Sequence, residues 1–482
     1  MSRYYATTSI PYVNGKPHIG HALELVQVDV LARHRRQRGD EVRAQTGTDD
    51  NALKNVHSAE AVGVSPAEYV ARVAERFVGL GSVLELGFDD FVRTSSDPRH
   101  APGVAKLWGA CAEDFYRRRY TGLYCVGCEV FYSPGELVDG RCPEHGTVPE
   151  TVAEDNWFFR LSRYQERLEK LVADDVVRVE PLARKREVLS FIRSGLEDFS
   201  VSRGTERARG WGIPVPGDPD QVVYVWFDAL ANYLTGPGYG TDDAGFRHWW
   251  TDGGERVHVI GKGIIRFHAV YWPAMLLSAG LALPTTIFVH EYLTADGRKI
   301  SKSEGNAEDP GDIVGRHGSD AVRWWLLSEV ARAGDTDYTD ERLVARANED
   351  LANNIGNLVN RTVSMIAKFG PALGGDPRAT ALRAARADAA GTIDRALAAF
   401  DFRRAVEAVT RIGDEANRYI QATKPWVLAK QGSPELPAVL GELLSTCRDL
   451  AEHLTPFLPS AAVRIAAQCD GAPISPVFPR LG

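Results

Sequence analysis

Long apolar runs are missing from this sequence of 482 residues. No segment approaches about eighteen uninterrupted apolar residues, so the sequence predicts no membrane span. The N-terminal stretch, residues 1–5, lacks the apolar core of a secretory signal and leads directly into patterned sequence. We therefore expect a cytoplasmic protein, and its length predicts two to four domains.

Net positive charge is also missing. Lysine and arginine number 56 against 64 aspartate and glutamate residues, which gives a formal net charge of −8. This balance argues against a dedicated nucleic-acid-binding domain, because such domains are usually basic. It does not exclude binding through a local patch, and basic clusters occur at residues 33–36, 117–119 and 184–186.

Cysteine is scarce, with six residues in the chain, and half of them fall in one short stretch. Cys125 and Cys128 form a C-x2-C pair, and Cys142 and His145 form a second short pair. In a cytoplasmic chain this spacing favours a metal site over a disulfide framework. Two such pairs are typical of a tetrahedral zinc site. Because four protein ligands leave no open position, we expect one structural zinc ion without a catalytic role.

The first fifty residues alternate between strand and helix patterns. Residues 4–13 are rich in β-branched and aromatic side chains and end at an Asn-Gly-Lys-Pro turn. Residues 21–38 carry apolar positions at helical spacing, and residues 41–46 again favour a strand. The order strand, helix, strand predicts a βαβ unit, and hence a parallel sheet with right-handed crossovers.

The remaining chain changes character twice. Residues 118–205 hold the cysteine cluster and many short turns, and they are predicted to be an insertion into the α/β fold. Strand patterns resume at residues 222–226, 257–261 and 286–290, and helical patterns dominate from about residue 340. We expect an α/β fold: a Rossmann-type parallel-sheet domain split by a zinc-knuckle insertion and followed by an all-helical domain. The expected boundaries are 1–117, 118–205, 206–340 and 341–482.

Two histidines, His18 and His21, stand where the first predicted strand gives way to the first helix. The free backbone N–H groups of a helix N-terminus favour phosphate, and Gly20 allows a ligand to approach the backbone closely. Two imidazoles there can donate hydrogen bonds to a phosphoryl group that gains charge in a transition state. For an isolated His-x-x-His pair, however, helix capping and packing is the commoner role.

A second stretch suited to phosphate is GRKISKSEGN, residues 297–306. Its lysines can follow the charge of a polyphosphate leaving group, and its flanking glycines allow the loop to close. A solvated basic loop is the alternative interpretation. Taken together, PHIGH at residues 17–21 and KISKS at residues 299–303 resemble the HIGH and KMSKS signatures of class I aminoacyl-tRNA synthetases.

Further stretches narrow the resemblance to the methionyl-tRNA synthetase family. VWFDALANY at residues 225–233 is similar to its substrate-pocket strand, and IGKGIIRFH at residues 260–268 is similar to its second pocket segment. Residues 417–420 and 424–426 resemble its anticodon-domain signature. The similarity extends from about residue 4 to about residue 430. It implies that the split α/β domain is catalytic and that the helical domain binds the anticodon.

The resemblance implies an ATP-dependent methionine–tRNA ligase. Methionine and ATP would first give an aminoacyl-adenylate and pyrophosphate, and the acyl group would then pass to the terminal ribose of the tRNA. The implied partners are ATP, methionine and tRNA(Met), with Mg²⁺ accompanying ATP and Zn²⁺ in the knuckle. Some relatives add a C-terminal dimerising module for which this chain has no room, so we expect a monomer.

The resemblance also implies roles residue by residue. His18 and His21 would contact the ATP phosphates, and Lys299 and Lys302 would hold the pyrophosphate. The implied ATP-binding residues are His18, Gly20, His21, Lys299, Ser301, Lys302 and Ser303. The implied methionine pocket comprises Ile10, Tyr12, Asp49, Trp226, Ala229, Leu230, Tyr233, Ile264 and His268, with Asp49 on the substrate ammonium. Asn357, Arg361 and Trp426 match anticodon-reading positions, where stacking and base-edge contacts suit a single-stranded loop.

The chain departs from the family pattern near the implied substrates. Family members usually read GTDEHG where residues 47–52 read GTDDNA, and they usually have Asp where this chain has Gly263. Two alternatives therefore stay open. One is a paralogue that activates an amino acid with ATP and passes it to a non-tRNA acceptor in specialised metabolism; the retained anticodon positions argue against it. The other is a catalytically inactive RNA-binding protein, against which both phosphate motifs argue.

Overall fold

The computed structural model describes residues 2–143, 146–252, 254–295, 297–300 and 308–482. The chain forms two compact units, each assembled from three separate stretches. The first unit comprises Met1–Pro17, Gly39–Gly81 and Gly87–His290, and the second comprises His18–Arg38, Ser82–Leu86 and Glu291–Gly482. The division into four domains expected from the sequence stays a prediction.

A six-stranded sheet forms the centre of the first unit, and every neighbouring pair of its strands is parallel. The parallel α/β fold expected from the sequence is therefore confirmed. Its strands are nearly continuous apolar runs, as is typical of parallel strands covered on both faces. Across the sheet the order is β3 (Asp90–Arg93), β2 (Glu41–Thr48), β1 (Arg3–Thr8), β12 (Glu255–Gly261), β13 (Thr286–His290) and β7 (Arg178–Glu180).

The segment expected to be an insertion contributes to this sheet and also forms sheets of its own. Its short strand β7 pairs with β13 at the sheet edge. An antiparallel sheet has the order β5 (Val130–Tyr132), β4 (Phe115–Cys125), β6 (Glu150–Phe159) and β8 (Phe199–Ser200). A smaller one has the order β10 (Pro214–Val215), β11 (Asp218–Val223) and β9 (Ser202–Gly204).

Helices of the first unit follow the strands in chain order. They are α2 (Leu53–Ala61), α3 (Pro66–Val83), α4 (His100–Ala110), α5 (Gln165–Ala173), α6 (Leu182–Arg193), α7 (Val225–Thr235), α8 (Asp243–Phe246) and α9 (Trp272–Ser278). π-Helical segments cover Arg247–Thr251 and Phe267–Tyr271. The position of α7 differs from expectation, because residues 225 and 226 were predicted to end a strand and instead begin this helix.

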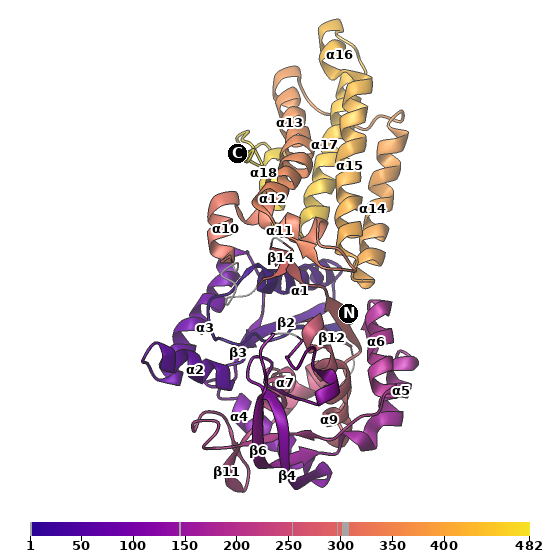
Figure 1. Cartoon of the computed structure of the whole chain (residues 1–482). Coiled ribbons are helices and arrows are strands. Elements are labelled where there is room, and N and C mark those ends of the chain that lie inside the picture. Colours follow the sequence, from indigo (N-terminus) through magenta and orange to yellow (C-terminus); the bar gives the residue numbers. More distant parts are fainter. Residues whose placement is uncertain (1, 144–145, 253, 296, 301–307) are drawn as a thin grey trace. The chain divides into compact units, whose positions relative to one another are not determined.

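The second unit is mainly helical, and in Figure 1 its long C-terminal helices lie side by side. Its helices are α1 (Ile19–Gln37), α10 (Pro310–His317), α11 (Ser319–Ser328), α12 (Asp340–Arg346), α13 (Asn357–Phe369), α14 (Thr380–Ala398), α15 (Phe402–Thr423), α16 (Pro425–Gln431), α17 (Leu436–Leu454) and α18 (Pro459–Cys469), with a π-helical segment at Ala347–Gly356. A small sheet has the order β15 (Arg298–Lys299), β14 (Leu293–Ala295) and β16 (Thr336–Asp337). Residues 338–482, all described, contain no strand, so the helical C-terminal part is confirmed.

One buried arginine explains why α1 belongs with the C-terminal helices. The Arg323 side chain is fully buried and donates to Asp29 Oδ2 at 2.7 Å. It also donates to the carbonyl oxygens of Leu84 at 2.9 Å and Phe457 at 2.7 Å. A buried guanidinium with this set of acceptors is satisfied, and it ties three distant segments of the second unit together. None of the helices in the described part of the chain is long and apolar enough to cross a membrane.

Candidate active site

One face of α7 gathers four of the residues expected to line an amino-acid pocket. Trp226, Ala229, Leu230 and Tyr233 are spaced at i, i+3, i+4 and i+7, so they share a face of the helix. All four are buried. The helix begins just after β11 ends, and this short connection fixes which residues face the pocket.

Aromatic rings make up most of the described pocket wall. The Tyr12 and Trp226 rings meet edge to face with centroids 6.2 Å apart. Trp226 also stacks on Phe267 at 3.7 Å with only 4° between the ring planes. The Tyr12 hydroxyl and the Trp226 Nε1 are buried without a hydrogen-bond partner among the described residues. A polar atom left in this condition marks a place where a ligand or water gives a hydrogen bond.

His268 is held in one neutral tautomer. Its Nδ1 lies 2.9 Å from the carbonyl oxygen of Ile264, which can only accept, so Nδ1 carries the proton. Its Nε2 then accepts from the Tyr233 hydroxyl at 2.8 Å. Burial lowers the pKa of His268 to about 4, so the ring is uncharged at neutral pH. The structure thus brings Tyr233, Ile264 and His268 together as an apolar surface without net charge.

Asp49 places a carboxylate beside this apolar surface. Its backbone N–H donates to Pro11 O at 2.9 Å, and Asp49 pairs with Tyr12 in an isolated parallel bridge. The side chain is buried, and its Oδ1 has no hydrogen-bond partner in the described part of the chain. Burial raises its pKa well above the usual range, and the nearby carboxylates of Asp228, Asp50 and Glu129 add to the effect. Ile10, the remaining expected pocket residue, lies close to Gly47.

The residues at which the chain departs from the family pattern have defined partners. Asp50 accepts from the Ser95 hydroxyl at 2.6 Å and lies 3.4 Å from Arg93. Asn51 donates through Nδ2 to Asp228 Oδ2 at 2.7 Å. Gly263 lies in the 3₁₀ turn Lys262–Ile264, just before the His268 segment. The Asn51 contact is the one that reaches the pocket helix.

Two functional candidates were missed by sequence reasoning, His100 and Asp228. Both side chains are fully buried, and His100 Nε2 lies 2.6 Å from Asp228 Oδ1. Asp228 had a usable signal, since it is a lone acidic residue in the apolar stretch 225–231. His100 had none, because it lies 128 residues away in sequence.

Lys54 connects the pocket with the cysteine-rich turn. Its Nζ lies 3.6 Å from the Tyr12 ring centroid and donates to Gly127 O at 2.7 Å. Its backbone N–H donates to Glu129 Oε1 at 3.1 Å. Burial lowers the pKa of the Lys54 ammonium, although Glu129 and Asp49 partly oppose the shift. The cation–π contact and these bonds hold the turn after β4 against Tyr12.

Cys125, Cys128 and Cys142 converge as the spacing predicted. Their three sulfur atoms all lie within 4.8 Å of one another, and Cys128 Sγ is 3.3 Å from Cys142 Sγ. Thiols this close, at the end of β4 and in the following turns, could hold a metal ion. His145, the fourth expected ligand, lies outside the described residues.

The two histidines of the second unit cap α1, which begins at Ile19. His18 Nδ1 accepts from Gly20 N, and His21 Nδ1 accepts from His18 N, each at 3.1 Å. The two rings stack with centroids 3.8 Å apart. Since both Nδ1 atoms accept, the proton of each neutral ring is on Nε2, where it can be donated to an anion. A Cβ at Gly20 would lie 3.0 Å from the His18 ring, so glycine keeps this arrangement open.

The basic loop is described only at its beginning. Lys299 ends β15, where its backbone pairs with Thr294. Ser301, Lys302 and Ser303 lie outside the described residues.

The expected anticodon residues lie on two helices of the second unit. Asn357 and Arg361 are one turn apart on α13, and Trp426 is in the first turn of α16. The Arg361 guanidinium lies 5.8 Å from the Trp426 ring centroid. The structure therefore brings a cation and an aromatic face together where a base could stack.

Comparisons with known proteins agree with this geometry. The family described as tRNA synthetases class I (M) matches residues 4–148 and 131–363. The methionine–tRNA ligase of Rhizobium meliloti is 41% identical over 479 residues, covering 96% of this chain and 91% of that protein. The Thermotoga maritima methionine–tRNA ligase is 38% identical and covers 96% and 74%. The structure of Mycobacterium tuberculosis methionyl-tRNA synthetase in complex with methionyl-adenylate is similar at 37% identity, with a TM-score of 0.91 over 100% of both chains. The chain thus belongs to the class I tRNA synthetases (M), the family of the methionine–tRNA ligases.

Proposed function

We propose that this chain is an ATP-dependent methionine–tRNA ligase that binds methionine in the pocket of Tyr12, Trp226, Tyr233 and His268. The observation that carries the proposal is a buried carboxylate, Asp49, beside an uncharged aromatic surface. The carboxylate matches an α-ammonium group, and the apolar surface matches a flexible thioether. Ala229, Leu230, Ile10 and Ile264 complete the proposed apolar lining.

His18 and His21 are proposed to stabilise the phosphoryl group of ATP. Their Nε2–H groups are fixed by the capping bonds at Nδ1, so they are donors prepared before the substrate binds. Gly20, Lys299, Ser301, Lys302 and Ser303 are proposed to complete the ATP site, with the lysines on the leaving pyrophosphate. Mg²⁺ bound to ATP would neutralise part of the phosphate charge. Transfer to tRNA(Met), read by Asn357, Arg361 and Trp426, would follow in the cytoplasm. The similarity to many methionine–tRNA ligases does not favour the alternative of a non-tRNA acceptor.

The pH dependence of methionine binding is expected to report on Asp49. Because the pKa of its carboxyl is raised, the free site is protonated below that pKa and must lose a proton to bind an ammonium group. The KM for methionine should therefore fall as pH rises, by up to about tenfold per pH unit. Initial rates of methionine-dependent ATP–pyrophosphate exchange measure this, and calorimetry in two buffers measures the released proton. A KM that does not change across the neutral range would contradict the assignment.

The cysteine cluster is proposed to hold one structural zinc ion through Cys125, Cys128, Cys142 and His145. Zinc so bound would cross-link the turns that follow β4 and would take no part in the reaction. Replacing Cys128 with serine is expected to remove the metal and lower the melting temperature of the protein, because the turn loses its cross-link. Elemental analysis and thermal unfolding measure these effects. Cys111→Ser is the matched control, since this buried cysteine lies near Met275 O rather than in the cluster; full metal content in Cys128→Ser would contradict the zinc site.

One pair of assays tests the proposed function as a whole. ATP–pyrophosphate exchange is measured with each common amino acid, and charging of total tRNA is then measured with the best one. Methionine should give the fastest exchange and should be transferred to tRNA. Exchange without charging would instead support transfer to another acceptor, and no exchange with any amino acid would overturn the enzymatic assignment.

A further inference from the structure

The back of the pocket helix α7 is polar and fully buried. Asp228 and Thr235 are seven residues apart, so they lie on one face, opposite the face that carries Trp226 and Tyr233. Both back-face side chains have no exposed surface to speak of, with 0% for each. Buried polar groups of this kind are costly unless every one is paired.

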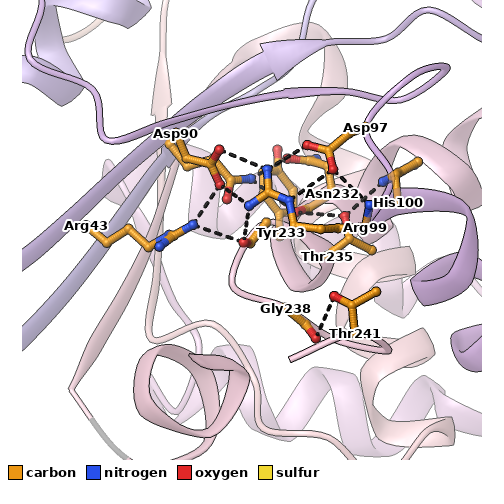
Figure 2. Close-up of polar contacts among 12 residues, drawn as sticks. Arg43, Asp90, Asp97, Arg99, His100, Asn232, Tyr233, Thr235, Gly238 and Thr241 are labelled. Atoms are coloured by element: carbon orange, nitrogen blue, oxygen red, sulfur yellow. Dashed lines mark hydrogen bonds and ion pairs between the residues drawn. The ribbon is translucent and has the colours of Figure 1, made fainter. Parts of the chain in front are cut away.

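His100 pairs with both of them. Its Nε2 lies 2.6 Å from Asp228 Oδ1, and because a carboxylate only accepts, this nitrogen donates. Its Nδ1 lies 2.8 Å from Thr235 Oγ1 (Figure 2). One imidazole ring, supplied by the first residue of α4, therefore grips the pocket helix near both of its ends.

The second carboxylate oxygen of Asp228 belongs to Asn51. Asn51 Nδ2 donates to Asp228 Oδ2 at 2.7 Å. Asn51 is only two residues from Asp49, so this bond joins the segment that carries the ammonium-binding carboxylate to the helix that carries the side-chain pocket. The remaining contacts between Tyr12 and α7 are aromatic packing, which fixes a position less sharply than a charge-assisted hydrogen bond.

The C-terminal end of α7 is held in the same way. The guanidinium groups of Arg43 and Arg99 both donate to the carbonyl oxygen of Gly236, at 2.9 Å and 2.8 Å. Asp90 accepts from both arginines (Figure 2). Cations at a helix C-terminus are favourable, so this end is anchored independently of Asn51.

We propose that Asn51 and His100 are positioning residues for amino-acid selection, which hold Asp228 so that the distance between Asp49 and the aromatic pocket fits methionine. The proposal rests on the function proposed above. It gives the departure from the family histidine at position 51 a role: asparagine keeps a donor for Asp228 there, and it does so without a titrating ring.

The test compares methionine with norleucine and leucine, which change the sulfur atom and the chain length. Asn51→Leu keeps the approximate size and removes the donor. A hydrogen bond to a buried carboxylate accounts for about a 10- to 150-fold effect, so the KM for methionine should rise by this order. Discrimination in kcat/KM against the two analogues should fall, with little change in kcat. Asn51→His, which restores a ring N–H donor, should recover both KM and discrimination.

A second pair of variants guards against a variant that fails to fold. Thr235→Val removes the hydroxyl that His100 contacts, and Thr235→Ser keeps it. The valine variant should lose discrimination in the same direction, and the serine variant should not. Melting temperature and metal content are measured for all four proteins.

Three results would overturn the proposal: unchanged KM and discrimination in Asn51→Leu and Thr235→Val, a fall in kcat alone, or equal losses for methionine and its analogues. Failure of the proposed function is seen separately, because the unmodified protein would then show no methionine-dependent exchange.

Discussion

Replacing Asp49 with asparagine is expected to raise the KM for methionine by about 30- to 4,000-fold, because one partner of a buried charge pair is lost. The expected cost of about 2–5 kcal/mol comes from leaving the substrate ammonium without its counter-charge in a buried site. ATP affinity should change little, since the residues proposed to bind ATP are elsewhere. Exchange kinetics measured at varied methionine and varied ATP separate the two constants.

Asp50→Asn is the matched control for this variant. Asp50 is the next residue, it is also buried, and its carboxylate faces Ser95 and Arg93 rather than Trp226 or Tyr12. Its methionine KM should stay close to that of the unmodified protein. Equal losses in Asp49→Asn and Asp50→Asn would show that the effect comes from disturbing the segment and not from the lost charge at Asp49.

Asp49→Asn should at the same time stabilise the free protein near neutral pH. A raised pKa in the folded state means that the folded protein binds more protons than the unfolded chain, so its stability falls as pH rises above the unfolded pKa. Asparagine removes this penalty, and the melting temperature should increase. Loss of binding together with gain of stability is the pattern expected of a functional residue held in an unfavourable environment.

Local features of this fold could be predicted from the sequence with good success. The N-terminus of α1 is encoded within a few residues, since His18, Gly20 and His21 supply both the cap and the donors. The C-x2-C spacing likewise brings Cys125 and Cys128 together without help from the rest of the chain. β12 and β13 were predicted because buried parallel strands are short apolar runs.

The start of α7 was predicted wrongly for a physical reason. A short apolar run such as residues 222–226 shows no period, so it cannot distinguish a buried strand from a buried helix. The N-cap of this helix is Tyr224, which makes no side-chain capping bond, so the usual start signal is absent as well. The predicted strand at residues 4–13 was too long for a related reason, because Pro11 cannot donate a ladder bond and β1 ends at Thr8.

Distant pairs could not be predicted from one sequence. Asn51 and Asp228 are separated by 177 residues, and His100 and Asp228 by 128. Nothing in the local pattern says which buried amide will meet which buried carboxylate, because only the folded sheet brings β2, α4 and α7 together. The pocket residues were found through family motifs, whereas their supporting polar groups needed the structure.

His21→Ala is expected to lower the rate of methionine-dependent exchange by about 10²- to 10³-fold, the usual effect of removing one fixed donor to transition-state charge. The loss should appear in kcat, because the proposed bond strengthens as charge develops on the phosphoryl group. Affinity for tRNA should stay nearly unchanged, since Arg361 and Trp426 are on other helices of the same unit. Stopped exchange assays and tRNA binding measure the two properties.

Stability has to be separated from catalysis in this variant, because His21 also completes the cap of α1 through the bond from His18 N. Loss of a cap costs about 0.5–2 kcal/mol. His21→Gln is the matched control: glutamine at this position can accept the same backbone bond, as it does in a capping box, so the melting temperature should recover. Its amide is not held where the imidazole Nε2–H is, so exchange should stay well below that of the unmodified protein. If His21→Gln restored full exchange along with stability, or if His21→Ala weakened tRNA binding strongly, the role of His21 would be structural and the proposed contact with phosphate would be wrong.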